Sequence, residues 1–248
     1  MKFTKTLLSL ILAIGLASPA IAQTIEVVTE QYPPYNYTEG GKIIGASTEV
    51  VEEVLKRAGI TYTLTSYPWT RAYKMAMEKA NVLIYSIGRN EKREKLFKWV
   101  DIIASYNIYL FKLKSRGDIT LNSIEDAKKF KLGGVRDDVR TQYLEKQGFA
   151  AGKEIDLVKN DELNIKKLKA GKIDLFPIDE NGMAYLAKQS GFSMDDFDKA
   201  LYIEELSAGL YMAFSTNTDD SVVNKCKEEL KKLKDDGTHA KIKSKYLK

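Results

Sequence analysis

The sequence predicts an α/β protein built from two similar units, each a mixed, mostly parallel sheet flanked by helices. A β-rich segment over residues 24–29 and a continuous apolar run over residues 82–87 are typical of strands, and two helix patterns and a further strand lie between them. A similar order of strands and helices begins again at residue 130. Alternation of strands with helices favours parallel pairing, with helices on both faces of the sheet.

The first unit continues with a loop, because the segment E-Q-Y-P-P-Y-N-Y after the first strand contains two prolines that cannot extend a β-ladder. Ser47 or Thr48 is a candidate N-cap for a helix that Gly59 ends. A strand beginning at Ile60 and a helix over residues 69–79 follow. The apolar run then completes a strand, helix, strand, helix, strand pattern.

The stretch G-R-N-E-K-R-E-K-L-F-K-W follows the apolar run and is rich in basic residues. Asn90 stands at an N-cap position, which predicts a helix with Arg93 in its first turn. An anion there would meet free backbone N–H groups, the positive end of the helix and the Arg93 guanidinium. An ordinary solvated helix is the alternative, because residues of opposite charge such as Glu91 and Lys95 stand four apart.

The second unit repeats this order, and two long β-type segments, residues 105–114 and 208–215, lie between the units. If both are strands that join the units, the chain crosses twice and leaves a cleft. A final helix over residues 220–236 then returns to the first unit. Within the second unit we expect, in order, the strand F-K-L-G-G-V, the helix D-D-V-R-T-Q-Y-L-E-K-Q-G, the strand I-D-L-V, the helix N-I-K-K-L-K-A-G, the strand I-D-L-F-P-I and the helix N-G-M-A-Y-L-A-K.

Residues 1–22 have the composition of a secretory signal peptide. Lys2 and Lys5 precede a short apolar core, and the segment A-I-A provides a small-residue cleavage site after Ala22. The apolar core is too short to span about 30 Å of hydrocarbon, which argues against the alternative of a membrane anchor. We therefore expect export, with a periplasmic location for the mature chain.

Charge and composition exclude several classes of function. The formal net charge of +5 includes two signal-peptide lysines, and basic and acidic residues are interspersed, so no concentrated basic field marks a nucleic-acid binder. There is no phosphate-binding G-x-x-x-x-G-K-[ST] loop. His239 is the only histidine and Cys226 the only cysteine, so a His-centred triad and a His/Cys metal site are not available. We expect neither a cofactor nor a nucleic-acid partner.

Aromatic and acidic residues gather where predicted strands end. Tyr32, Tyr35, Tyr37 and Trp69 have the positions of a small-molecule cleft wall, although surface or interface residues fit the pattern equally. Asp179 ends a strand of the second unit. Its carboxylate would either pair with a ligand ammonium or supply negative charge to the N-terminus of the next helix.

Taken in order, five blocks of sequence resemble the family 3 extracellular solute-binding proteins, the polar amino-acid receptors of ABC importers. The blocks are Y-P-P-Y-N-Y-T-E-G-G-K-I-I-G, Trp69, S-I-G-R-N-E-K-R-E-K-L-F-K-W, L-K-A-G-K-I-D-L-F-P-I-D-E and L-K-K-L-K-D-D-G-T-H-A-K-I-K-S-K-Y. The resemblance implies a two-lobed, type II periplasmic-binding-protein-like fold whose lobes close on a ligand about two crossing hinge strands. Lobe 1 would comprise residues 23–112 and 208–248, and lobe 2 residues 113–207.

The resemblance also implies roles for individual residues. In the family an arginine clamps the α-carboxylate of the amino acid, and that arginine falls on Arg93 here. Tyr32 and Trp69 would sandwich the ligand side chain. Asp179 would hold the α-ammonium, and Ser86 is the small polar residue near the end of the strand. The remaining candidate ligand-binding residues are Glu30, Asp137 and, as a second anion contact, Arg71.

Departures from the family pattern bear on the ligand. Where the family has Gly-Ser/Thr after the first strand of the second lobe, this chain reads V-R-D-D-V-R. Asp137 and Asp138 would repel a carboxylate placed against them. These aspartates either cap the helix or indicate a ligand that is cationic or is not an α-amino acid. Gly88 also replaces a frequent serine or threonine, and A-S at residues 46–47 stands where Phe-Asp is common.

The resemblance therefore implies a solute-binding protein that captures a polar amino acid or related small solute and passes it to the membrane permease of an ABC importer. We expect a monomer without enzymatic activity. An enzyme on the same scaffold is the first alternative, because the family includes a cyclohexadienyl dehydratase, and Asp179 or Glu180 would then be the acid. A receptor that signals through a membrane partner is the second alternative.

Overall fold

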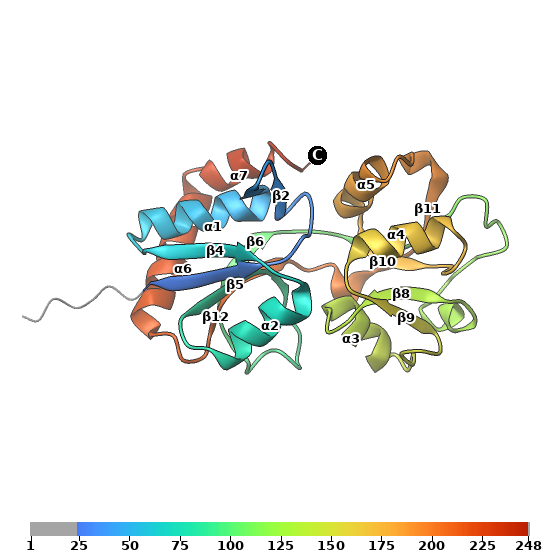
Figure 1. Ribbon diagram of the computed structural model, residues 1–248, viewed down its shortest axis with the longest axis horizontal. Coiled ribbons are helices and arrows are strands. Elements are labelled where there is room, and N and C mark those ends of the chain that lie inside the picture. The colour runs from blue at the N-terminus through green and yellow to red at the C-terminus, as the bar shows by residue number, and fades with distance from the viewer. Residues whose placement is uncertain (1–23, 248) are drawn as a thin grey trace, which may run out of the picture.

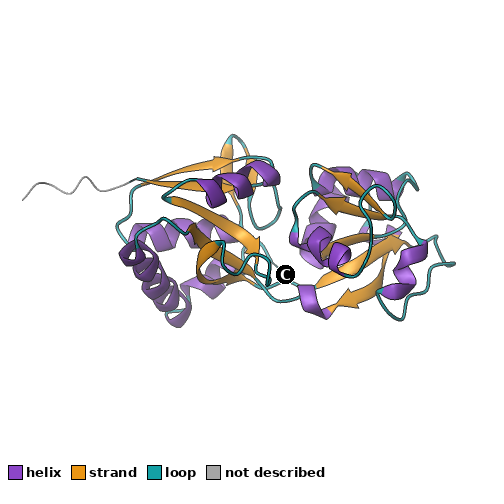
Figure 2. Cartoon of the chain, turned by 90° about the horizontal axis from the view of Figure 1, so that it is seen from below, coloured by secondary structure: helices purple, strands orange, loops and turns teal. Residues whose placement is uncertain are grey.

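The computed structural model describes residues 24–247 as two α/β lobes joined by two crossings of the chain (Figure 1). The predicted signal peptide lies outside the described residues. Figure 2 shows that each lobe is a separate group of strands flanked by helices. The two-lobed α/β architecture expected from the sequence is confirmed.

Lobe 1 is built on a five-stranded mixed sheet. Its strands, in spatial order, are β4 (Tyr62–Ser66), β1 (Ile25–Thr29), β5 (Val82–Gly88), β12 (Leu210–Ser215) and β6 (Phe97–Ala104). β1 runs parallel to β4 and β5, whereas β12 runs antiparallel to β5 and β6. A short hairpin of β2 (Tyr37–Glu39) and β3 (Lys42–Ile44) follows the proline-containing loop.

Helices cover both faces of this sheet. α1 (Ala46–Arg57), α6 (Asp220–Asp235) and α7 (Thr238–Lys243) bury apolar residues against one face, and α2 (Trp69–Glu78) packs on the other. β5 is buried along its whole length because it lies at the centre of the sheet, between these layers. The N-cap of α1 is Gly45, so the cap expected at Ser47 or Thr48 is wrong. A Cβ on residue 45 would lie 2.4 Å from the Tyr35 carbonyl oxygen, a contact only glycine avoids.

Lobe 2 contains two small sheets side by side. β7 (Ile108–Leu113) lies between β10 (Phe176–Asp179) and β11 (Phe197–Ile203) and is antiparallel to both, and β8 (Leu132–Val135) is parallel to β9 (Ile155–Val158). A hydrogen bond from the Gly133 amide to the Leu175 carbonyl connects the two sheets. The helices α3 (Val139–Lys146), α4 (Asp161–Lys169) and α5 (Glu180–Gln189) follow β8, β9 and β10. Their N-termini therefore gather at the carboxyl ends of these strands, where α/β sheets bind ligands.

Two expectations about the region between the lobes need correction. Residues 91–96 form turns that lead into β6, so the helix expected after Asn90 is wrong. Residues 108–112, which we assigned to lobe 1, belong to β7 and pair within the sheet of lobe 2. The chain crosses just before β7 and again between η3 (Glu204–Leu206) and β12. We therefore propose that lobe 2 begins with β7. Two further short 3₁₀ helices of this lobe are η1 (Glu125–Lys129) and η2 (Met194–Asp196).

Candidate functional site

A small cavity lies between the lobes, near the ends of several strands. Its volume is ≈ 10 Å³, about the space that one water molecule needs, because side chains of both lobes meet around it. A larger cavity of ≈ 430 Å³ adjoins it beside α3. Three residues that line the smaller cavity each have a buried polar side-chain atom without a hydrogen-bond partner. None of the described residues that line the larger cavity has such an atom. We therefore place the candidate site at the smaller cavity. Its lining residues are Glu30, Tyr32, Trp69, Ser86, Gly88, Arg93, Tyr106, Asp138, Val139, Arg140 and Leu210.

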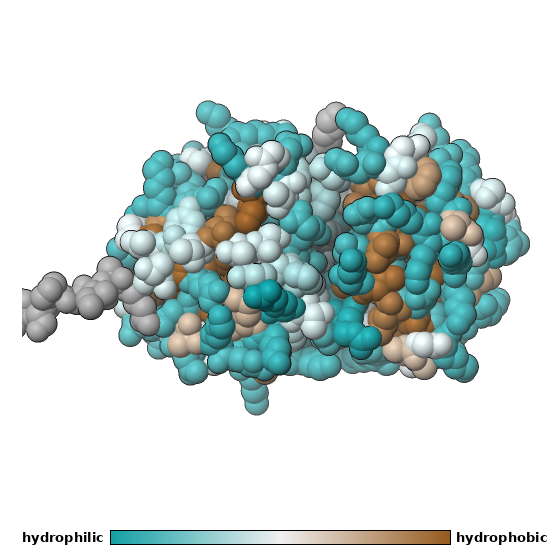
Figure 3. All heavy atoms as spheres, viewed as in Figure 1, coloured by the Kyte–Doolittle hydropathy of each residue, from teal (hydrophilic) through white to brown (hydrophobic). Residues whose placement is uncertain are grey.

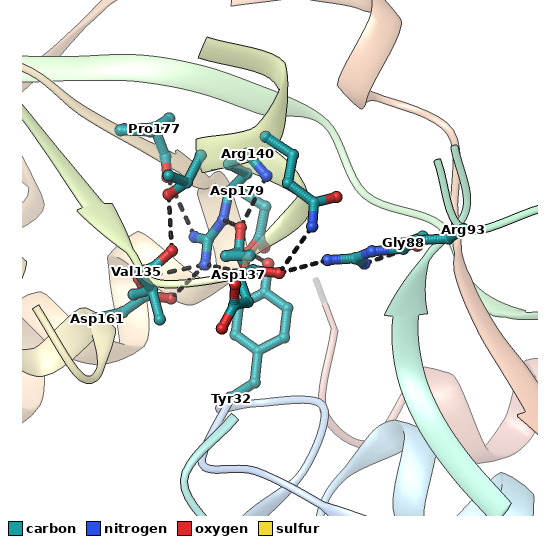
Figure 4. A network of polar contacts seen from close by, with 12 residues as sticks. Tyr32, Gly88, Arg93, Val135, Asp137, Arg140, Asp161, Pro177 and Asp179 are labelled. Atoms are coloured by element: carbon teal, nitrogen blue, oxygen red, sulfur yellow. Dashed lines mark hydrogen bonds and ion pairs between the residues drawn. The ribbon is translucent and has the colours of Figure 1, made fainter. Parts of the chain in front are cut away.

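Arg93 is the residue of the basic stretch that turns inward. Its side chain is 0 % exposed, and the Oδ1 atom of Asn90 fixes the turn by accepting a hydrogen bond from the Arg93 amide at 2.9 Å. The guanidinium donates from Nη1 to the Gly88 carbonyl at 2.9 Å and from Nη2 to the Asp137 carbonyl of lobe 2 at 2.7 Å (Figure 4). Its Cζ atom lies 5.3 Å from the ring centroid of Trp69, and its Nε atom has no partner. Burial lowers the pKa of Arg93, but an arginine stays charged in a protein.

Ser86 is an extra, bulged residue of β5 with a left-handed backbone. Its φ is +57°. Its neighbours Tyr85 and Ile87 pair with consecutive residues of β12, so Ser86 itself has no partner on that strand. A residue other than glycine in this conformation costs of the order of 1–3 kcal/mol, and such strain is concentrated at functional sites. The hydroxyl of Ser86 is buried without a partner, like Nε1 of Trp69 and Nε of Arg93. Three such donors around one cavity fit a ligand that supplies hydrogen-bond acceptors.

Asp179 is already bound by groups of the protein. Its Oδ2 atom accepts a hydrogen bond from the Tyr32 hydroxyl at 2.7 Å, and its Oδ1 atom accepts from the Tyr35 hydroxyl at 2.8 Å and the Gly182 amide at 2.9 Å. Burial raises the pKa of Asp179, although these three bonds oppose the shift. The carboxylate caps α5 and ties lobe 2 to lobe 1. It reaches the cavity through Tyr32 rather than lining the wall itself.

Arg140 is a second guanidinium at the cavity, and the sequence analysis did not single it out. It pairs with both oxygens of Asp138, at 2.7 and 3.1 Å. It also pairs with Asp161 at 3.0 Å (Figure 4). Burial lowers the pKa of Arg140, but the two carboxylates outweigh this and raise it. Burial also raises the pKa of Asp138, yet Arg140 outweighs it and holds that pKa below its usual range. For Asp161 burial prevails, and its pKa is raised.

Glu30 ends the first strand region of lobe 1 and faces this network across the cavity. Among residues 24–247 its carboxylate makes no hydrogen bond or ion pair, although its own backbone carbonyl accepts one from Asn36. The pKa of Glu30 is raised well above its usual value by burial, and further by the carboxylates of Asp138 and Asp161. The cavity therefore combines an unpaired carboxyl of lobe 1 with an acidic network of lobe 2.

The remaining candidates lie outside the cavity wall. Arg71 is exposed, and its guanidinium covers the ring of Tyr67 at 4.2 Å. Asp137 is also exposed, and only its carbonyl contacts Arg93. Glu180 pairs with Lys199 at 2.8 Å on the surface. The structure brings the other predicted residues together around the cavity: Glu30, Tyr32, Trp69, Ser86 and Arg93.

One sequence signal would have pointed to Arg140. It stands in the first turn of α3, where a positive charge opposes the helix dipole. A basic residue at that position implies a local carboxylate partner, and Asp138, two residues earlier, is both that partner and the N-cap of the helix. Tyr106, the other polar lining residue that we missed, lies in an ordinary β-type segment and gives no comparable signal.

The described part of the chain has neither a metal-binding cluster nor a membrane-spanning helix. Within residues 24–247, no three or more His, Cys, Asp or Glu side chains are arranged to hold a metal ion. No helix in the same range is both long enough and apolar enough to cross a bilayer.

The chain is similar in sequence and in structure to known binding proteins and to a sensor domain. A relative from Campylobacter jejuni, described as a probable histidine-binding protein, is 24% identical over 234 residues, which are 90% of this chain and 84% of the relative. The crystal structure of a histidine kinase sensor domain with similarity to periplasmic binding proteins has a TM-score of 0.79 at 20% identity, over 91% of this chain and 96% of that one. An ancestral arginine-binding protein bound to arginine has a TM-score of 0.78 at 20% identity, over 91% and 98%.

The family comparison covers nearly all of the described residues. The sequence profile of the bacterial extracellular solute-binding proteins, family 3, matches residues 25–248. A match of that extent, together with the two-lobed fold, confirms the resemblance noted in the sequence. The chain belongs to the bacterial extracellular solute-binding proteins, family 3.

Proposed function

We propose that the protein captures a small polar solute of the amino-acid class between its lobes and delivers it to the membrane permease of an ABC importer. One observation carries this proposal: Arg93, Ser86 and Trp69 each leave a buried donor without a partner, and all three line one cavity between the lobes. An unpaired buried donor costs about 1–3 kcal/mol. A carboxylate in the cavity would recover much of that cost.

Arg93 is the proposed anchor for the carboxylate of the solute. Its Nη2 atom now donates to the Asp137 carbonyl of lobe 2. We infer that a carboxylate takes the place of this carbonyl and bonds to two nitrogens of the guanidinium, a geometry that lysine does not offer. Ser86 would add a third hydrogen bond, and the rings of Tyr32 and Trp69 would contact the rest of the solute.

Closure of the lobes would enclose the solute. Contacts within the protein already cross the cleft and would break when the lobes open. A direct contact of Asp179 with a solute ammonium stays a prediction, because a tyrosine would have to move first. The crossing hydrogen bonds are Tyr32–Asp179, Tyr35–Asp179, Arg93–Asp137, Asn90–Gln142 and Lys146–Glu91.

We propose a periplasmic location, because the first 22 residues have the composition of a signal peptide and the family is one of extracellular binding proteins. We also propose that the protein is a monomer, because few large hydrophobic side chains are exposed on the described surface. Among the described residues, the exposed large hydrophobic side chains are those of Met77 and Tyr202, and hydrophilic residues cover most of the face in Figure 3. We assign no cofactor and no nucleic-acid partner.

The alternative of an enzyme has less support than a binding protein, because of where Asp179 and Glu180, its candidate acids, lie. Asp179 accepts three hydrogen bonds and Glu180 is exposed, so neither is placed as a free acid in the cavity. Incubation with prephenate or arogenate tests this alternative, and an aromatic product would favour it. Permease and ATPase genes beside the gene for this protein would favour transport over signalling through a membrane partner.

A thermal-shift screen of residues 23–248 tests the proposal. The panel contains amino acids, polyamines and small organic acids. A solute at 100 times its dissociation constant adds about 2.7 kcal/mol of stability, which raises the Tm by roughly 5–10 °C in a chain of this size. We expect α-amino acids among the hits. Stabilisation only by solutes that lack a carboxylate would contradict the role of Arg93.

A further inference from the structure

The smaller cavity has room for only a small part of an amino acid. Its volume of ≈ 10 Å³ is about the space that one water molecule needs, which is close to the size of a methyl group. Pockets that bind small molecules usually measure about 300–1,000 Å³, and the larger cavity, at ≈ 430 Å³, lies in that range. The two cavities share three lining residues, Gly88, Tyr106 and Val139, so they meet at one place.

Both lobes enclose the larger cavity. Residues 88–92 of lobe 1 and helix α3 of lobe 2 form two of its walls, and both crossings of the chain complete it. Asn90 donates a hydrogen bond to Gln142 at 3.0 Å, and Lys146 donates one to Glu91 at 3.0 Å. Each of these bonds joins lining residues of opposite lobes. The closure that encloses the smaller cavity therefore also encloses any group held in the larger one.

The buried part of the wall of the larger cavity is mainly apolar. Val139, Tyr106 and Leu206 are 8 %, 7 % and 6 % exposed. The lining residues that are exposed to solvent are charged or small, and they are Arg89, Glu91, Lys92, Lys146, Glu205 and Ala208. An apolar wall with a charged rim fits an apolar group of the solute, because burial of that group away from water favours binding.

The backbone carbonyl of Asp137 connects the two cavities. It accepts a hydrogen bond from Nη2 of Arg93 at 2.7 Å (Figure 4) and one from Nε2 of Gln142 at 3.3 Å. Arg93 lines the smaller cavity, and Gln142 lines the larger. In the proposed function the carboxylate of the solute takes the place of this carbonyl on Arg93. The carboxylate then lies between the cavities, and the rest of the solute has access to both.

Gly88 leaves the junction of the cavities free of a side chain. Its carbonyl accepts a hydrogen bond from Nη1 of Arg93, so it lies beside the proposed anchor. A Cβ atom on Gly88 would lie 2.7 Å from Cγ1 of Val139, and both residues line both cavities. The serine or threonine that is frequent here in the family would fill this junction. The glycine therefore suits a solute that passes from one cavity to the other.

We propose that the solute is a dipeptide with a small C-terminal residue, whose carboxylate binds Arg93 beside the smaller cavity, and an apolar N-terminal residue, whose side chain fills the larger cavity. The inference rests on the proposed function, because it uses the same carboxylate anchor. The peptide group would pass the amide of Gln142, which both donates and accepts hydrogen bonds. The amino group would reach the exposed rim, where Glu205 supplies a negative charge.

Calorimetric titration of residues 23–248 with L-alanine, L-leucyl-L-alanine and L-alanyl-L-leucine tests the proposal. The two dipeptides have the same composition, but only leucyl-alanine has the large side chain at its N-terminal residue. We expect leucyl-alanine to bind at least about tenfold more tightly than either other probe, because only its leucine side chain is buried in the larger cavity. Ala208→Phe should reduce its advantage over L-alanine to about threefold or less, because the ring would fill that cavity. Ala80→Phe is the matched control, since Ala80 is an exposed alanine of lobe 1 that lines neither cavity.

The outcomes separate this inference from the proposed function. If leucyl-alanine binds no more tightly than L-alanine or alanyl-leucine, the inference is overturned and the proposed function stands. An advantage that Ala208→Phe leaves unchanged has the same meaning, and if this variant does not fold, the comparison of the two dipeptides decides alone. If none of the three probes binds but a solute of the thermal-shift screen does, the inference is again wrong.

The C-terminal amide of leucyl-alanine tests the carboxylate anchor, because it lacks the carboxylate and keeps the leucine side chain. Loss of binding in the amide supports the anchor on which the inference rests. An amide that binds as tightly as leucyl-alanine contradicts the Arg93 anchor, and the proposed function and the inference then fail together.

Discussion

The Tyr32 hydroxyl donates a 2.7 Å hydrogen bond to Oδ2 of Asp179, and this bond joins the two lobes across the cleft. Tyr32 belongs to the loop after β1, and Asp179 is the N-cap of α5. The Tyr35 hydroxyl donates to the other carboxylate oxygen at 2.8 Å. The same carboxylate thus starts a helix of lobe 2 and holds two tyrosines of lobe 1. Opening the lobes must break both bonds, so they contribute to the stability of the closed state.

Tyr32→Phe tests this contribution. A hydrogen bond to a charged group is worth about 1.5–3 kcal/mol, so we expect the affinity for the solute to fall roughly tenfold or more. Tyr62→Phe is the matched control, because its hydroxyl donates to Glu52 at 3.0 Å on lobe 1, away from the cleft. Small-angle scattering of Tyr32→Phe without solute should show a larger radius of gyration. Equal affinities in the two variants would contradict the contribution of the bond to closure.

Gly88 permits the close approach of the lobes. A Cβ atom on this residue would lie 2.7 Å from Cγ1 of Val139 in lobe 2. Gly88→Ala should therefore hinder closure and lower the affinity for the solute about tenfold, since overpacking typically costs about 1–3 kcal/mol. Gly117→Ala is the control, because no atom lies within 4 Å of a Cβ placed there. A Gly88→Ala variant that binds like the unmodified protein would show that the lobes close with room to spare.

Glu30 makes the stability of the protein depend on pH. Its folded-state pKa is raised above 4.5, so the native state binds a proton more readily than the unfolded chain. The stability linked to Glu30 is complete below its unfolded pKa and is lost as the pH rises through its folded pKa. One pKa unit corresponds to about 1.4 kcal/mol, and the Tm of a chain this size changes by roughly 2–4 °C per kcal/mol.

Glu30→Gln should therefore raise the Tm of the protein without solute at pH 7, and by progressively less as the pH falls towards 4. Differential scanning calorimetry across this pH range, with Glu39→Gln as the control, provides the measurement. A lower Tm for Glu30→Gln at pH 7 would mean that Glu30 has a favourable partner which the cavity does not show.

The strands and helices could largely be predicted from the sequence, because burial determines their patterns. The apolar run of β5 is buried along its whole length, as expected for the centre of a sheet. The prediction of a helix after Asn90 was wrong for a physical reason. Asn90 accepts a hydrogen bond from the residue three positions later, as an N-cap does, but the chain continues as turns. A cap residue and charges spaced four apart therefore do not distinguish a helix from a capped turn.

The site was only partly predictable, because it depends on contacts between segments far apart in the chain. The inward position of Arg93 followed from the family resemblance. The left-handed backbone of Ser86 depends on its register with β12, which the local sequence does not encode. The expectation for Asp138 left two alternatives open, and the structure shows it as the N-cap of α3 and as a partner of Arg140. The contact between Asp138 and Arg140 is local, whereas the contact of Arg140 with Asp161, 21 residues later, required the tertiary structure.

The most direct test of the account is the affinity of Arg93→Lys for the solute found in the thermal-shift screen, measured by calorimetry on residues 23–248. Arg89→Lys is the control, because Arg89 is a neighbouring arginine that pairs outward with Glu94. We expect Arg93→Lys to lose more than about 1.4 kcal/mol, a tenfold loss of affinity, since lysine cannot bind a carboxylate through two nitrogens. Arg89→Lys should bind normally. Unchanged affinity in Arg93→Lys would contradict the assignment of Arg93 as the carboxylate anchor, and with it the central claim.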